Sequence, residues 1–281
     1  MQQKVYPTDV SDQQWVLIQP FLPAPVHLGR RRTTHLREVV NAILYLLRSG
    51  GAWRLLPHDF PPWQTVYRYF RAWLAAGIWE GIHTALRERL REKVGRKATP
   101  SAGIVDSQSV KITCQKGFRG YDGAKKVNGR KRHVLVDTQG LLLKVVVSPA
   151  NIQDTDGAEV LFERIKGHFP SLKHIWVDGG YKGQFIKMMK KRFKITVEVV
   201  KHAWGELKRG VWLPADAEPP IIPTGFHVLP RRWVVERTFA WLGMYRRLSK
   251  DYEEHLQVSE GMVQIAMINL MRRRLTYKEQ S

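Results

Sequence analysis

Apolar residues recur at helical spacing through the first hundred residues of the chain. Ser11 and Gln14 have the spacing of a capping box, and the apolar residues that follow share one helical face at Trp15, Ile18 and Leu22. The same periodicity predicts three further helices, over residues 36–47 before Gly50-Gly51, from Pro62 to Gly77, and over 79–93. Residues 1–97 are therefore expected to form an all-helical domain.

Beyond residue 100 the pattern changes to short β-branched runs that alternate with helical segments. Strands are predicted over 103–112, 131–137, 141–148, 174–177 and 194–200, and helices over 156–166, 184–192, 232–247 and 259–273. A proline-rich segment at about 203–230 is expected to be mostly loop. Residues 98–281 are thus predicted to form an α/β domain, a mixed sheet flanked by helices with a proline-rich insertion.

The third predicted helix has two contrasting faces. Val66, Tyr69, Phe70 and Trp73 make one face apolar, and the other face carries Gln64, Arg68 and Arg71. A preceding helix joined through a glycine-containing turn makes this region helix-turn-helix-like, which favours base reading by the polar face. The alternative is that these side chains form an ordinary solvated helix surface.

Charge strengthens the case for a nucleic-acid partner. The chain has 46 Lys and Arg against 25 Asp and Glu, a net charge of +21, and both predicted domains are basic. A polyanion is the natural partner of such a surface, although a basic protein without a specific partner is the alternative. Cys114 is the only cysteine, which excludes a disulfide framework, and no apolar stretch approaches a membrane span. We expect a cytoplasmic protein that does not enter a membrane.

Three acidic residues lie where carboxylates are costly. Asp106 interrupts an apolar strand, Asp178 ends another before Gly179-Gly180, and Glu236 lies on a helix near Phe239 and Ala240. Three such carboxylates suggest shared cations, and a pair of metal ions is what phosphodiester cleavage uses. Oxygen ligands without His or Cys indicate Mg²⁺ or Mn²⁺. The alternatives are strand-end capping by the aspartates and an ion pair of Glu236 with Arg232.

Basic residues surround these acids in the sequence. The first group is Lys111, Lys116, Arg119, Lys125, Lys126, Arg130, Lys131 and Arg132, and the second is Arg232, Arg237, Arg246, Arg247 and Lys250. Phosphate contact is the functional interpretation of both groups, and a solvated hairpin is the alternative for the first. Trp204 and Trp212 are candidates for stacking on a splayed base, although core packing suits them equally. His133 is expected to be structural.

Five motifs carry a family resemblance. They are Val105-Asp-Ser-Gln-Ser-Val-Lys111, Gly120-Tyr-Asp-Gly-Ala-Lys-Lys126, Gly129-Arg-Lys-Arg-His133, Val177-Asp-Gly-Gly-Tyr181 and the segment 229–241 around Glu236. In this order they closely resemble bacterial insertion-sequence transposases of the DDE class, nearest to the insertion-sequence-five family. The resemblance implies an RNase H-like fold with Asp106 on the first strand, Asp178 after the fourth, and Glu236 on a later helix. These three residues would be both the catalytic acids and the ligands of two Mg²⁺ or Mn²⁺ ions.

The resemblance also implies a substrate and a reaction. The enzyme would bind double-stranded DNA at the terminal inverted repeats of its element, cut there, and transfer the 3′ ends into target DNA as a homodimer or larger assembly. Leu229 and Gly243 stand where the wider class has a tyrosine and a lysine, so Arg246, Arg247 or Lys250 would supply the missing phosphate contact. The alternatives are an RNase H-like structure-specific nuclease without strand transfer and a non-catalytic DNA-binding regulator.

Overall fold

The computed structural model describes residues 6–24, 32–113, 116–200 and 231–277. Its helices are α1 (Asp12–Ile18), α2 (Leu36–Ser49), α3 (Trp63–Ala75), α4 (Ile78–Lys93), α5 (Asp154–Arg164), α6 (Gln184–Met188), α7 (Trp233–Gly243) and α8 (Leu256–Thr276). Its strands are β1 (Ala102–Lys111), β2 (Gly120–Asp122), β3 (Val127–Asp137), β4 (Leu142–Pro149), β5 (His174–Val177) and β6 (Thr196–Val199). The predicted proline-rich insertion, with Trp204, Trp212 and Leu229, lies outside the described residues, as does Cys114.

The N-terminal helices begin and end where the sequence signals them. Ser11 and Gln14 form the reciprocal hydrogen bonds of a capping box at α1, and Gly50 ends α2 in the left-handed conformation. Proline precedes α3 at Pro62. Residues 50–62, which include the 3-10 turn η2 (Trp53–Leu55), join α2 to α3, a longer connection than the short turn of most helix-turn-helix motifs.

A mixed sheet follows, with β3 and β1 at its centre. The strand order is β2-β3-β1-β5-β6, and β4 also pairs with β3. β1 is antiparallel to β3 and parallel to β5, which is in turn parallel to β6. This arrangement, preceded by helices, confirms the predicted fold class of helical N-terminal region and helix-flanked mixed sheet.

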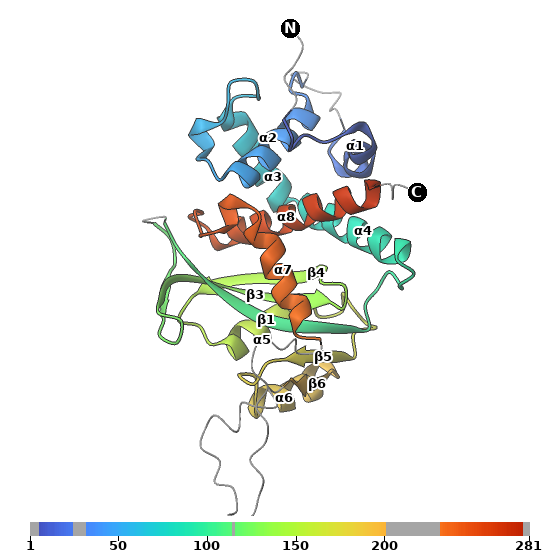
Figure 1. Ribbon diagram of the computed structural model, residues 1–281, viewed down its shortest axis with the longest axis vertical. Coiled ribbons are helices and arrows are strands. Elements are labelled where there is room, and N and C mark those ends of the chain that lie inside the picture. The colour runs from blue at the N-terminus through green and yellow to red at the C-terminus, as the bar shows by residue number, and fades with distance from the viewer. Residues whose placement is uncertain (1–5, 25–31, 114–115, 201–230, 278–281) are drawn as a thin grey trace, which may run out of the picture.

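Two hydrophobic cores cover the two faces of the sheet. On one face, Ile104 and Val134 pack in a core shared with α2, α4, α7 and α8. On the other, Val105 and Leu135 pack against α5 and α6. Figure 1 shows α1–α4 and α8 gathered at one end of the molecule, while α7 spans from this helical end down across the sheet. Alternate residues of β1 and β3 therefore face different environments.

Some elements differ from the sequence-based expectation. β2 is too short to show a hydrophobic alternation, and α6 gives way to a π-helical turn, η3 (Met189–Phe193). The helix bearing Glu236 ends at Gly243, and a 3-10 turn, η5 (Arg246–Leu248), follows before α8. Glycine is a poor helix former, which agrees with this early end. Within the described ranges, no helix has both the length and the apolar character that a membrane span requires.

Candidate active site

Asp106 and Asp178 lie at equivalent levels of two neighbouring parallel strands. The register of β1 and β5 pairs Ala102 with His174 and Ile104 with Trp176. Continued by two residues, it places Asp106 opposite Asp178. β5 ends at Val177, so beyond this level no described strand of the sheet pairs with β1 on the β5 side. The two carboxylates therefore lie at the point where β5 has ended and β1 continues without a neighbour on that side.

The surroundings of Asp106 disfavour its charge. Burial is the largest influence and raises its pKa, the Ser107 N–H lowers it through a hydrogen bond of 2.7 Å, and the charge on Asp178 raises it, with a net value of about 6. Asp178 also lies near the basic side chain of Arg232 and accepts the Gly180 N–H at 2.8 Å. A partly buried carboxylate beside a second carboxylate is the setting that a divalent cation stabilises.

Arg232 connects these aspartates to Glu236. Its Nη2 lies 3.8 Å from Asp178 Oδ2, and its Nε lies 3.6 Å from Glu236 Oε1. The Nε is buried and makes no hydrogen bond. α7 packs against β1, which brings Glu236 to the face of the sheet that Asp106 occupies. The structure thus brings the three sequence-predicted acids to one end of the sheet, with a guanidinium between two of them.

The residues present suit a hard divalent cation, although they do not form a closed cage. Within the described part of the chain, no group of three His, Cys, Asp or Glu side chains is close enough to hold one metal ion together. The available donors at this end of the sheet are carboxylate oxygens, the type that Mg²⁺ and Mn²⁺ prefer. Arg232 provides the positive charge between Asp178 and Glu236.

A polar network behind Asp106 was not anticipated from the sequence. Ser107 donates to Asp154 Oδ1 at 2.7 Å, and Lys131 Nζ lies 2.9 Å from the same oxygen. The hydroxyl of Tyr181 is fully buried without a hydrogen-bond partner, and its pKa is raised first by burial and then by Asp154, Asp106 and Asp178. Asp154 starts α5, where acidic residues are common, so its sequence signal resembled ordinary helix capping.

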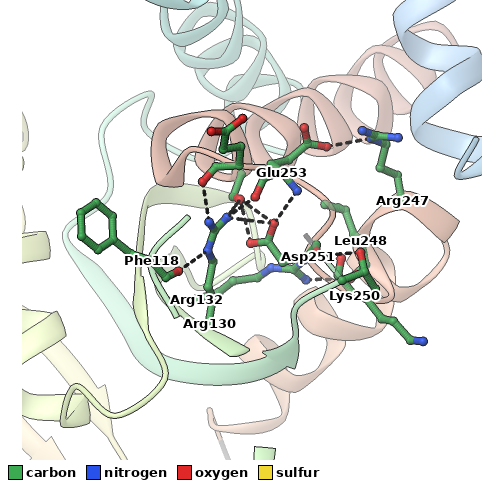
Figure 2. Close-up of polar contacts among 11 residues, drawn as sticks. Phe118, Arg130, Arg132, Arg247, Leu248, Lys250, Asp251 and Glu253 are labelled. Atoms are coloured by element: carbon green, nitrogen blue, oxygen red, sulfur yellow. Dashed lines mark hydrogen bonds and ion pairs between the residues drawn. The ribbon is translucent and has the colours of Figure 1, made fainter. Parts of the chain in front are cut away.

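Four of the predicted phosphate contacts are instead buried: Arg130, Lys131, Arg132 and Arg247. Arg130 is fully buried, and its guanidinium donates to the carbonyls of Phe118, Glu253 and Glu254 and to Asp251 and Ser259 (Figure 2). Lys131 is 7% exposed and its ammonium bonds Asp154 and the Ile152 carbonyl. None of the four side chains can reach a phosphate in this structure, so the prediction that they contact DNA is wrong.

The surrounding residues complete a group of buried and mostly hydrogen-bonded charges, here called the arginine cluster: Arg130, Arg132, Arg247, Asp251 and Glu253 (Figure 2). Arg132 donates to the carbonyls of Leu248 and Lys250. Arg247 donates to Glu253 at 2.8 Å and to the Gly51 carbonyl, so it is also unavailable as a substitute for the missing lysine. The cluster ties β3 to the segment between η5 and α8.

The other predicted contacts remain accessible. Lys111, Lys125, Lys126, Gln64, Arg68, Arg246 and Lys250 are exposed, and Arg71 and Arg237 are half-buried. Arg68 lies over the ring of Tyr69 and Arg71 bonds the Tyr67 hydroxyl, so both are held on α3. Their contact with DNA stays a prediction.

Family models assign the chain to a class of protein. Residues 97–271 match the family described as "Transposase DDE domain", and residues 10–83 match "Putative transposase of IS4/5 family". The first match covers more than half of the chain and contains Asp106, Asp178 and Glu236. The chain therefore belongs to the DDE transposase family, in the IS4/5 group. It is a DNA-transposing enzyme, and the domain implies a DNA substrate and divalent metal dependence.

Two relatives match parts of the chain. One is the "Insertion element IS402 uncharacterized 16.2 kDa protein" of Burkholderia cepacia, 32% identical over 108 residues, which are 36% of this chain and 72% of that protein. The other is "Uncharacterized protein y4sN" of Sinorhizobium fredii, 34% identical over 69 residues, which are 25% of this chain and 55% of that protein. The first name agrees with an insertion-element origin.

Proposed function

We propose that this transposase cuts and joins DNA at the site formed by Asp106, Asp178 and Glu236. The observation that carries the proposal is the parallel register of β1 and β5, which sets Asp106 beside Asp178. Arg232 adds to it, because it lies within 4 Å of both Asp178 and Glu236. The charge of Asp178, which together with burial raises the pKa of Asp106 to about 6, supports the same assignment, because two carboxylates held together suit a shared cation.

Each residue of the site has a proposed role. Asp106, Asp178 and Glu236 would hold two Mg²⁺ or Mn²⁺ ions, which when bound supply Lewis acidity at the attacking and leaving oxygens. Arg232 would turn from the carboxylates to the phosphate that is cut, because a guanidinium matches phosphate oxygens in pairs. Ser107, Asp154 and Lys131 hold β1 against α5 and so fix the backbone that carries Asp106.

The proposed reaction has two displacements at phosphorus. Water attacks a phosphodiester at the end of the element, the bond to the 3′ oxygen breaks, and a free 3′-hydroxyl and a 5′-phosphate result. That 3′-hydroxyl then attacks a phosphodiester of the target. The element 3′ oxygen becomes bonded to the target 5′-phosphate, and the bond to the target 3′ oxygen breaks, which releases a target 3′-hydroxyl. No bond to the protein forms. Because two element ends must be joined together, we propose that the active species is a homodimer or larger assembly on the terminal inverted repeats.

A joining assay tests this function. The full-length protein, Mg²⁺, a duplex carrying the native element end and a separate target duplex should give a nicked end and a longer joined strand on a denaturing gel. Glu236→Gln should give neither product while still binding the duplex. Nicking without joined strands would favour a structure-specific nuclease, and binding without nicking by the wild type would favour a DNA-binding regulator; either result overturns the proposal.

A further inference from the structure

Arginine and tryptophan side chains alternate in a stack that leads away from the acids. Trp233, Arg237 and Trp241 are four residues apart on α7, so they share one side of that helix. The Arg237 guanidinium lies 4.3 Å from the ring of Trp233 and 4.8 Å from that of Trp241. Arg274 of α8 lies 4.2 Å from the Trp241 ring. The stack begins next to Arg232 and ends near the C-terminal end of α8.

These arginines lack the acidic partners that structural arginines have. Arg237 donates to the Gln139 carbonyl at 3.0 Å, while its Nε is buried without a hydrogen bond. The pKa of Arg274 is lowered, first by burial and then by the charge of Arg237, so two like charges have been brought together. Among the described residues, no carboxylate forms an ion pair with Arg237, Arg273 or Arg274. The buried Asp137 acts on Arg237 through its charge but is paired with Arg91. A cluster of cations with so little compensation is the setting for an anionic ligand.

Two hollows flank the end of the stack, and we call them together the cationic groove. One, of about 260 Å³, lies between Trp241 and α8 and is lined by Arg48, Arg272, Arg273 and Arg274 among others. The other, of about 450 Å³, shares Arg274 and is lined by Lys93 and Gln139. Neither has an Asp or Glu among its described lining residues. Arg272 is buried beneath and bonds the neutral oxygens of Asn269, Gln14 and Thr8, so its charge adds to the positive potential.

The exposed positions of α7 between the acids and the groove carry small residues. After Glu236, the exposed positions of α7 are Ala240 and Gly243, and nothing lies near where a Gly243 side chain would stand. Gly243 to Glu236 spans seven residues of helix, about 10 Å, which equals about three phosphate steps of one strand when these are measured along the duplex axis at ~3.4 Å each. A polymer backbone can therefore lie close along α7.

We propose that one DNA strand runs from the acid site along α7 into the cationic groove, where Arg273 and Arg274 contact its phosphates about three to five nucleotides from the cut. This inference rests on the proposed function, because it takes the acids as the point of cleavage. The acid-free lining favours a phosphate backbone, and continuity with α7 favours the strand that is being cut. The groove thus replaces the phosphate contact that Gly243 lacks.

The test is a pair of matched charge reversals. Arg273→Glu changes an exposed groove cation, and Lys166→Glu makes the same charge change just after α5, on the opposite face of the sheet. Binding to the element-end duplex is measured by fluorescence anisotropy in EDTA, so that cleavage plays no part. Loss of one phosphate contact at ~0.1 M salt should weaken binding about eightfold and reduce the log–log salt slope by ~0.9. Lys166→Glu should change neither beyond twofold.

Phosphate ethylation interference then locates the contact. In the wild type, ethyl groups at about three to five nucleotides from the cut should block binding, and Arg273→Glu should lose that signal alone. If Arg273→Glu matches Lys166→Glu, or the interference lies elsewhere while the wild type binds and cuts, the groove assignment is overturned. Normal cutting by acid-site variants would overturn the proposed catalytic site and the start of the strand path, while the phosphate contact of Arg273 would still be decided by the binding and interference measurements. Arg273→Gln removes the same positive charge without adding a negative one. If its thermal unfolding matches that of the wild type, weaker DNA binding by this variant is not caused by a folding defect.

Discussion

The acid site and the arginine cluster occupy the same face of one sheet, but the charged groups of the two sites have different partners. Arg130 in the cluster is fully buried, and its guanidinium donates hydrogen bonds to three carbonyls, Asp251 and Ser259 (Figure 2). Asp106 in the acid site has a second carboxylate nearby, and Arg232 there has an unbonded Nε. A buried charge with an opposite partner marks a part of the scaffold, and two like charges held together mark a place prepared for a ligand that is not protein.

The contrast explains why adjacent basic residues have unrelated roles. β3 carries Arg130, Lys131, Arg132 and His133 in a row, and the strand turns them alternately to α8 and to α5. The α8-facing arginines meet Asp251 and main-chain carbonyls, while Lys131 meets Asp154 on the other face. By contrast, the partners of Arg237, Arg272 and Arg274 among the described residues are tryptophan rings and neutral oxygens.

The largest expected loss of stability comes from breaking the arginine cluster. Asp251→Asn leaves Arg130 without its carboxylate in a buried site, and removal of one partner of a buried ion pair costs ~3–5 kcal/mol. Urea unfolding measures the change. The matched control is Glu159→Gln, which removes an exposed partner of Arg192 and should cost ~1 kcal/mol or less. Equal effects of the two substitutions would mean that the cluster is not a structural element.

A smaller effect is expected from His133, which lies in β3 next to Arg132 but faces α5. Burial lowers its pKa to about 4, and its ring packs against Gly157 and bonds Ser148. Because the folded pKa lies below the unfolded value of ~6.5, the unfolded chain binds the proton first as the pH falls. This histidine therefore stabilises the fold above pH ~6.5, and ~3 kcal/mol is lost between there and pH ~4.

His133→Gln checks that sign. The variant should be less stable at pH 7 but should show a flatter fall of unfolding free energy between pH 6.5 and 4, while His255→Gln, an exposed control, should keep the wild-type slope. An unchanged slope in His133→Gln would place the acid sensitivity elsewhere, for example at buried His83, whose pKa is lowered to about 3 by burial.

Much of the fold could be predicted from the sequence because its signals are local. The capping box at Ser11, the glycine at Gly50 and the apolar period of α2 need only a few neighbouring residues. The acid trio was recognised from motifs, and its residue types and positions agree with the structure's placement of Asp106 opposite Asp178.

The rest depended on contacts between distant segments. Arg130 looked like a solvated cation because its partners, Asp251 and Ser259, lie more than 120 residues away. A charged run in a strand indicates exposure only when one face of the sheet is open, and here α5 and α8 cover both faces. The cationic groove could not be predicted either, since it forms where α8 meets α7 and α4.

The most direct test of this account is the cleavage rate of Asp106→Asn on a duplex that carries the native element end, with unfolding measured on the same preparation. The amide keeps the shape of the carboxylate and removes a charge that burial disfavours, so stability in EDTA should stay unchanged or rise. Cleavage in Mg²⁺ should fall by at least ~10³-fold, equivalent to ~4 kcal/mol of transition-state stabilisation, while DNA binding persists. Cleavage within tenfold of the wild type, or a loss of stability like that of Asp251→Asn, would contradict the assignment of Asp106 to the catalytic site.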